Sequence, residues 1–153
     1  HDRTVVDAAL ERAENTGAAA AAIELPDGKI LTGKTSNLLG PSAALILNAL
    51  KDLAGIDHNL HVISPTAIEP IQKVKTQYLG SKNPRLHIDE ILIALSISSA
   101  ANPAAQLAME QLPKLKGCQV HTSVMLSSVD IKLFKKLGIQ LTCEPKYEHN
   151  PIY

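Results

Sequence analysis

The chain has 153 residues, of which 45% are hydrophobic and 20% charged, a composition typical of one folded domain rather than a disordered chain. Its 15 basic and 15 acidic residues balance, which argues against a dedicated nucleic-acid-binding domain because that function needs clustered positive charge. Aromatic residues make up 3% and tryptophan is absent, so we expect an aliphatic core without stacking platforms for bases.

The cellular location is predicted from the hydropathy pattern and the cysteines. The longest apolar stretches, such as residues 91–97, are interrupted by serine and are far shorter than the ~20 residues that span a bilayer. Cys118 and Cys143 are isolated, which favours reduced thiols in a cytoplasm over a disulfide framework. The first residue is His1 rather than Met, which indicates a piece of a longer chain. We therefore predict a cytoplasmic protein without membrane contact.

The first third of the chain predicts a helix, a β-hairpin and a second helix, over residues 4–15, 18–25 paired with 29–32, and 43–54. Gly17 ends the first helix, and a Pro-Asp-Gly turn at residues 26–28 reverses the chain between the strands. Pro41 and Ser42 open the second helix, whose nearly continuous apolar surface predicts deep burial.

The rest of the chain predicts, in order, a strand, three helices, a strand, a helix and a strand, over residues 61–64, 65–79, 89–101, 103–112, 119–126, 128–137 and 139–143. Pro70 is expected to kink or split the helix that contains it. Residues 80–85 form the longest predicted loop, and residues 144–153 an irregular tail of a single domain over residues 1–153.

This order of elements predicts a three-layer α/β/α fold with a mixed sheet. The hairpin requires one antiparallel pair, while strand-helix-strand units favour parallel neighbours. The topology is similar to the cytidine-deaminase-like fold, a likeness that carries no function by itself.

The phosphate-loop pattern of Gly, four residues and Gly-Lys-Thr is satisfied by residues 28–35. A phosphate loop must open directly into a helix, whereas here the middle residues are strand-like and Pro41 delays the next helix. We therefore predict that this pattern lies on the hairpin. Lys34, Thr35 and Ser36 can still face an anion from the end of its second strand.

The sequence gives little support for zinc-dependent catalysis or for a catalytic nucleophile. Zinc deamination needs a His or Cys beside a Glu and a nearby Cys pair, and no helix start here supplies them. The nearest substitute begins at His87, where we instead predict Asp89 as a helix N-cap. Cys118 and His121 lie three residues apart on a strand and face opposite sides, so they are predicted to be a structural thiol and a surface imidazole. We predict no metal and no cofactor.

The remaining polar residues form a cluster rather than a recognisable motif, and this cluster suggests a ligand site. The hairpin end and the long loop both carry cationic and hydrogen-bonding side chains, and loops of this kind often bind ligands. A solvated connector that makes local turns also explains the same residues. The candidate ligand-binding residues are Lys34, Thr35, Ser36, Lys82, Asn83, Arg85 and His87.

Seven stretches carry a family resemblance: LTGKTSNLLG, NALKDLAGID, ISPTAIEPIQ, YLGSKNPRLH, DEILIALSIS, QLPKLKGC and FKKLGIQLTCEPKY. They resemble a large family of bacterial proteins described as uncharacterised or as a domain of unknown function. The resemblance implies that this chain is the C-terminal region of proteins about three times longer. It also implies an upstream Rossmann-like part with a Gly-rich, Lys-containing loop.

Two functions follow as hypotheses. The first is an accessory domain that packs against upstream domains, with residues 91–97 as an interdomain or oligomer interface. The second is a module that binds a nucleotide or phosphorylated metabolite through the candidate residues. The sequence leaves open whether the domain is catalytic and whether it forms a homo-oligomer.

Overall fold

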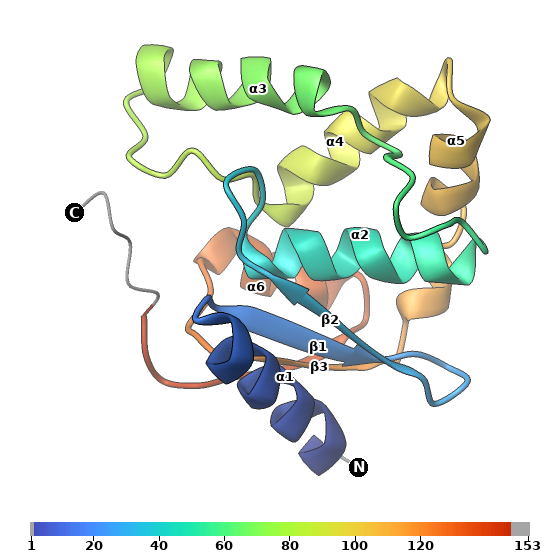
Figure 1. The fold of residues 1–153 in the computed structure, drawn as a ribbon, viewed down its shortest axis with the longest axis vertical. Helices are drawn as coiled ribbons and strands as arrows, with labels where there is room; N and C mark the ends of the chain where they lie inside the picture. The colour runs from blue at the N-terminus through green and yellow to red at the C-terminus, as the bar shows by residue number, and fades with distance from the viewer. Residues whose placement is uncertain (1, 148–153) are drawn as a thin grey trace.

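The computed structural model describes residues 2–147 and contains a four-stranded mixed sheet (Figure 1). The strands are β1 (Ala20–Glu24), β2 (Ile30–Lys34), β3 (Gln119–Thr122) and β4 (Gln140–Cys143), in the order β2-β1-β3-β4. β1 is antiparallel to both of its neighbours, and β3 is parallel to β4. Consequently β2, β3 and β4 run in one direction, and their carboxyl ends meet at the edge of the sheet where β1 begins.

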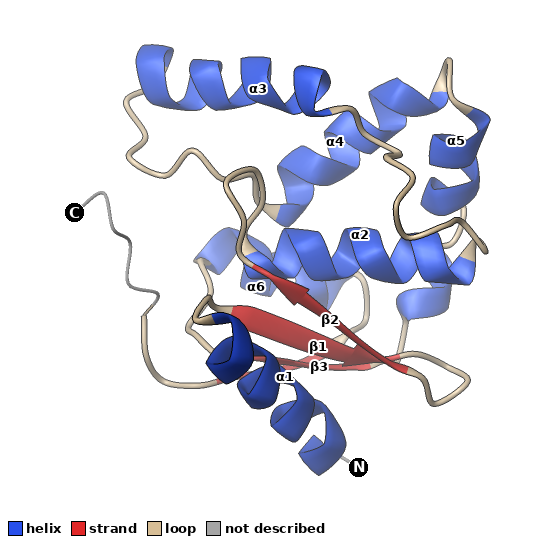
Figure 2. Cartoon of the chain, viewed as in Figure 1, coloured by secondary structure: helices blue, strands red, loops and turns tan. Residues whose placement is uncertain are grey.

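Helices cover both faces of the sheet (Figure 2). α1 (Asp2–Thr16) contacts β1, β2 and β3 on one face, while α2 (Pro41–Leu53) and α6 (Ser128–Lys136) pack on the other. Beyond α2 lies a further helical layer of α3 (Pro65–Lys73), the π-helical turn η1 (Val74–Tyr78), α4 (Ile88–Ser99) and α5 (Pro103–Met109). The 3-10 turn η2 (Leu112–Leu115) leads from α5 back to β3. The predicted α/β class and mixed sheet are confirmed. Along residues 2–147, no helix has the length and apolar character to cross a membrane.

The sheet divides the core into two parts because neighbouring strand residues point to opposite faces. The two parts are unequal in size. On the α2 face, Ile23 and Val120 join a large aliphatic cluster that includes Leu45 of α2 and Phe134 of α6. On the α1 face, the buried cluster consists of Val5, Ala9 and Ala22. The α2 face therefore holds most of the buried apolar surface.

The phosphate-loop pattern lies on the β1–β2 hairpin, as predicted, and its second glycine has a packing role. A Cβ atom at Gly33 would lie 2.4 Å from the backbone nitrogen of Leu45, so only glycine lets β2 approach α2 this closely. The following helix, α2, begins at Pro41, six residues beyond the pattern. The glycine spacing is thus explained by strand–helix packing.

The predicted strand in the middle of the chain is wrong. Residues 61–64, all of them described, form no strand; Val62 and Ile63 instead bury apolar side chains in the core from an irregular segment. Ser64 caps α3, its Oγ accepting a hydrogen bond from the Thr66 nitrogen at 3.2 Å. Pro70 does not split α3, because the helix continues through it to Lys73 and the irregular turn η1 follows only afterwards.

Candidate functional site

A cleft of about 1030 Å³ lies where β2, β3 and β4 end. Its walls come from residues 34–37 at the end of β2, residues 123–124 after β3, residues 146–147 after β4 and residues 17–19 before β1. Arg85, from the loop before α4, and Leu10, Ala13 and Glu14 of α1 complete the lining. In open α/β sheets, ligands bind in the crevice outside the carboxyl ends of the strands, which is the position of this cleft.

Three cationic side chains line the cleft: Lys34, Arg85 and Lys146. Among the described residues, none of the three has a carboxylate within ion-pair distance. Glu14, in the last turn of α1, is the acidic residue of the lining. Positive charge gathered in a concave surface raises the local concentration of anions, so the cleft favours a negatively charged ligand.

Arg85 is held in place by contacts to the loop that follows β2. Its Nε donates to the Ser36 carbonyl oxygen at 2.6 Å, and its backbone nitrogen donates to Asn83 Oδ1 at 3.0 Å. A parallel bridge between Leu39 and Leu86 joins the same two loops. Residues far apart in the sequence are therefore fixed side by side at the mouth of the cleft.

A buried lysine supports the Arg85 loop from behind. Lys75, in η1, is 8% exposed, and its Nζ donates to the Arg85 carbonyl oxygen at 2.6 Å and to Glu90 Oε1 at 2.9 Å. The same Glu90 oxygen accepts a hydrogen bond from the His87 nitrogen at 2.8 Å. This network connects η1, the loop and the first turn of α4 into one unit.

Thr35 provides an unsatisfied hydrogen-bonding group in the cleft lining. The residue is 7% exposed, its backbone nitrogen donates to the Ala19 carbonyl oxygen at 2.8 Å, and its hydroxyl has no partner among residues 2–147. Buried hydroxyl groups in native proteins are normally hydrogen-bonded to protein or water. Its position beside three cations is therefore suited to a polar ligand.

The structure divides the predicted site residues into two groups. Lys34, Thr35, Ser36 and Arg85 line one cleft, whereas Lys82, Asn83 and His87 do not line it. Lys82 is exposed, Asn83 shapes the turn before Arg85, and His87 precedes the first turn of α4. A part for these three in binding stays a prediction.

The predicted N-cap at Asp89 is wrong, because α4 begins at Ile88 with His87 in the cap position. The side chains of His87, Asp89 and Glu90 can bring ligand atoms within 4.8 Å of one another. However, the Glu90 oxygen is already occupied by the Lys75 ammonium and the His87 nitrogen. Helix capping and ion pairing therefore account for this cluster.

Sequence reasoning missed Lys146 and misjudged His121. Lys146 follows a strand parallel to β2, a position that predicts convergence with Lys34, but the surrounding tail was expected to be irregular. His121 was expected to be a surface imidazole; it is 4% exposed, with Nδ1 2.6 Å from Thr142 Oγ1 and Nε2 2.8 Å from Glu144 Oε2. It is buried because its strand is central and α1 covers that face.

The two cysteines are free thiols. Burial raises the pKa of the Cys118 thiol, with a smaller contribution from Glu24, so its reactive thiolate form is disfavoured. Cys118 belongs to the aliphatic core, which fits the structural role predicted for it.

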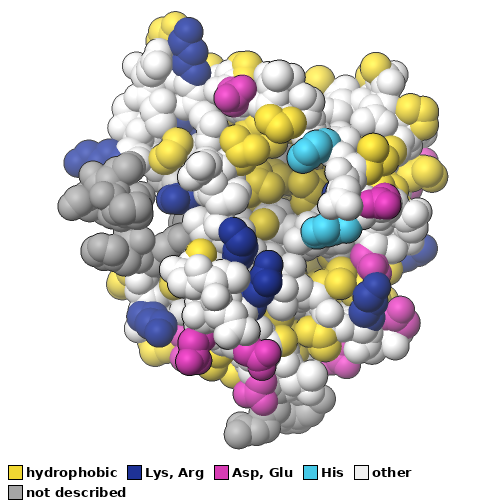
Figure 3. All heavy atoms as spheres, viewed as in Figure 1, with side chains coloured by type: hydrophobic (Ala, Val, Ile, Leu, Met, Phe, Trp, Pro, Cys, Tyr) yellow, Lys and Arg dark blue, Asp and Glu magenta, His cyan; other side chains and the backbone are white. Residues whose placement is uncertain are grey.

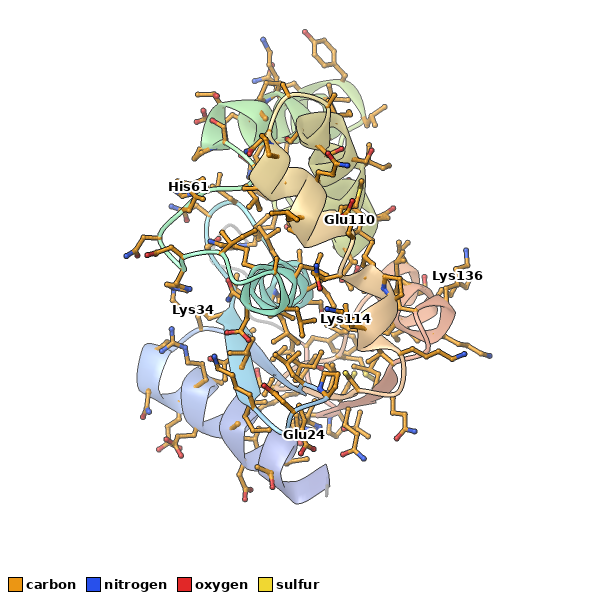
Figure 4. The ribbon with its side chains drawn as sticks, turned by 90° about the vertical axis from the view of Figure 1, so that its right-hand side faces the viewer. Glu24, Lys34, His61, Glu110, Lys114 and Lys136 are labelled. Carbon is orange, nitrogen blue, oxygen red and sulfur yellow. The ribbon has the colours of Figure 1, made fainter. Side chains whose placement is uncertain are left out.

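Lys136, in the last turn of α6, is a basic residue outside the cleft. Figure 4 shows Lys34 and Lys136 on opposite sides of the molecule, so the two do not belong to one basic surface. The cationic character of the cleft is thus a local feature of a chain whose net charge is zero.

Comparison with known proteins shows the family to which the chain is similar. The model described as "Domain of unknown function DUF1846, C-terminal" matches residues 1–153. A UPF0371 protein of Corynebacterium efficiens is 59% identical over 152 residues, which cover 99% of this chain and 31% of that protein. A UPF0371 protein of Streptococcus pyogenes serotype M5 is 49% identical over 152 residues, with the same coverage. The chain thus spans about a third of the curated relatives it matches, and the predicted resemblance is confirmed.

Proposed function

Since this chain belongs to the DUF1846 C-terminal domain family and spans about a third of its relatives, we propose that it provides a larger protein with a binding cleft for a phosphate-bearing small molecule. The observation that carries the proposal is the convergence of Lys34, Arg85 and Lys146 at the carboxyl ends of three parallel strands. This conclusion develops the second of the two hypotheses drawn from the sequence.

Phosphate is the anion that fits the donors best. The Arg85 guanidinium can present paired N–H groups to a phosphate, while lysine ammonium groups act as compact positive charges beside it. Thr35 and Ser36 add hydroxyl groups to the same wall. The cleft volume of about 1030 Å³ matches the upper range of small-molecule sites, which favours a metabolite or nucleotide over a bare ion.

Titration calorimetry and thermal melting with inorganic diphosphate, nucleotides and phosphorylated metabolites test this proposal. A ligand that binds only the folded state raises the melting temperature. Lys34→Ala is expected to weaken diphosphate binding about tenfold, because a charge-assisted hydrogen bond contributes about 1.5 kcal/mol. Lys136→Ala, on the opposite side of the molecule, is the matched control and should bind as the wild type does.

Two results would contradict a phosphate-binding cleft. One is a wild-type chain whose melting temperature and calorimetric signal do not respond to any of these compounds. The other is an equal loss of affinity in the Lys34 and Lys136 variants, which would indicate general charge attraction rather than a site.

A second candidate function, interdomain packing, is supported by apolar side chains on the outer helical layer. Ile93 and Ile97 of α4 are 59% and 70% exposed and lie one turn apart on one face. Tyr78 and Leu79, at the end of η1, are 71% and 75% exposed. Figure 3 shows hydrophobic side chains concentrated in the upper half of that view, over this layer.

We expect this surface to contact other parts of the larger protein, while a homo-oligomer is the alternative that sizing can detect. The isolated chain should bind a hydrophobic dye, and Ile97→Ser should reduce that binding, whereas Val129→Ser, on α6, is the control. A monomer that binds no dye would count against this role.

Three finer points complete the proposal. The antiparallel hairpin followed by parallel strands, with helices on both faces, supports a cytidine-deaminase-like topology. Two free cysteines support a cytoplasmic location. Asn83 and His87 are proposed to act behind the cleft by shaping the Arg85 loop, and Lys82 to extend its positive potential.

A further inference from the structure

The segment that follows β4 carries Lys146 to the cleft through a small number of contacts. The Glu144 nitrogen donates to the Thr122 carbonyl oxygen at 2.9 Å, which extends the pairing with β3. The Met125 nitrogen donates to the Lys146 carbonyl oxygen at 2.6 Å. A further contact is between side chains, from Glu144 Oε2 to His121 Nε2 at 2.8 Å. The Lys146 side chain is itself exposed.

Both ring nitrogens of His121 are hydrogen-bonded, Nε2 to Glu144 of this segment and Nδ1 to Thr142 of β4. The tautomer with its proton on Nε2 donates to Glu144, and Nδ1 then accepts from the Thr142 hydroxyl at 2.6 Å. On the α1 face of the sheet, His121 is paired across the ladder with Ala22, which packs against Val5 and Ala9 of α1. Among the described residues, Glu144 is the acidic partner within ion-pair distance of the ring.

We infer that His121, acting through Glu144, is a positioning residue that presents Lys146 to the anion in the cleft. The inference rests on the proposed function of that cleft. His121 does not line the cleft, so its effect on a ligand is indirect. Fixing the backbone of a residue costs conformational entropy, and the part-buried His121–Glu144 contact meets part of this cost before a ligand arrives.

Catalysis by the same residues is a weaker interpretation. Thr142, His121 and Glu144 form a hydroxyl–imidazole–carboxylate chain of the kind that activates nucleophiles. However, Thr142 does not line the cationic cleft; it lines a hollow of about 70 Å³, too small for most substrates. Positioning requires no substrate at Thr142 and therefore agrees better with the geometry.

Calorimetry with inorganic diphosphate on the whole chain tests the inference. Lys146→Ala and Glu144→Ala are each expected to weaken binding about fivefold to tenfold, which corresponds to about 1 kcal/mol. Glu144→Gln should restore most of the affinity, because its amide oxygen still accepts the Nε2 proton. The double variant Glu144→Ala with Lys146→Ala should bind no more weakly than Lys146→Ala alone, since both changes remove the same contact.

The outcomes separate this inference from the proposed function. If Lys34→Ala loses affinity while Glu144→Ala or Lys146→Ala binds like the wild type, the positioning role is overturned and the cleft stands. If the two losses add in the double variant, Glu144 acts independently of Lys146 and the inference also fails. Should Glu144→Ala melt at a lower temperature, Lys146→Ala and Glu144→Gln still decide the question. A wild-type chain that does not bind diphosphate overturns the proposed phosphate site and this inference together.

Discussion

The two faces of the sheet differ in what they bury. The α2 face packs large aliphatic residues together with Phe134, whereas the α1 face buries only small or β-branched residues and accommodates the polar ring of His121. The last turn of α1, including Ala13 and Glu14, also forms part of the cleft wall. Stability is therefore expected to come mainly from the α2 face, while the end of α1 on the other face contributes to the wall of the ligand cleft.

This division agrees with a general feature of proteins. Elements that contact ligands often belong to the less stable parts of a structure, while the most stable parts are those with the largest apolar burial. Substitutions on the two faces can test whether the same division applies here.

Phe134→Ala is expected to give the largest loss of stability. Phe134 is fully buried in the α2-face cluster, so its removal leaves a cavity and should lower the free energy of unfolding by about 3–5 kcal/mol. Chemical denaturation measures this change. A loss below about 1 kcal/mol would mean that the α2 face is not the main source of stability.

Gly33→Ala should cost about 3 kcal/mol, near the upper end of overpacking effects, because the new Cβ would meet the backbone of Leu45 rather than a movable side chain. Gly40→Ala is the matched control: the nearest atom to its added Cβ is 3.8 Å away, so little change is expected. Equal denaturation midpoints for the two variants would contradict the close approach of β2 to α2.

Val5→Ala tests the α1 face and should cost about 1.5 kcal/mol, the loss expected for two buried methyl groups. Thermal and chemical denaturation measure this change in parallel with that of Phe134→Ala. If Val5→Ala destabilises the domain as strongly as Phe134→Ala does, the proposed difference between the two faces is wrong.

Asp130→Asn is expected to have the smallest effect, with a size that depends on pH. Burial raises the pKa of the Asp130 carboxyl, partly opposed by the hydrogen bond that Oδ1 accepts from the Ile88 nitrogen. Folding therefore favours the protonated form, and the wild type loses stability as pH rises from the unfolded to the folded pKa. Asparagine keeps the acceptor without the charge, so its advantage in melting temperature should grow as the pH rises from the ordinary carboxyl pKa to the raised one. An advantage that is constant with pH would contradict this account.

Local signals in the sequence predicted most of the helices and strands. Ser64 and Ser127 cap helices, Pro41 begins one, and the turn at residues 26–28 joins the hairpin, because each of these residues acts on its immediate backbone. The segment at residues 61–64 was misread because buried apolar residues resemble a strand when the partner that would pair with them is unknown. Pairing is a tertiary property, which a short apolar run does not carry.

The site was predicted only in part, because the approach of its residues to one another is also a tertiary property. Lys34 and Arg85 were both candidates, but their approach depends on the Leu39–Leu86 bridge and on the hydrogen bond from Arg85 to Ser36. Lys146 could not be recognised without knowing that β4 runs parallel to β2. The burial of His121 likewise depends on α1 crossing its strand, which the residues around position 121 do not reveal.

The central position of β1 has a consequence for how the domain folds. Its amino end is joined to β3 by a hydrogen bond from the Ala20 nitrogen to Ser123 Oγ, across 103 residues of sequence. During synthesis the hairpin and the first two helices emerge well before β3, so one edge of β1 has no neighbouring strand for most of that time. Contacts between such distant residues slow folding and leave strand edges exposed to aggregation. We therefore expect the nascent domain to depend on chaperones until its last third has left the ribosome.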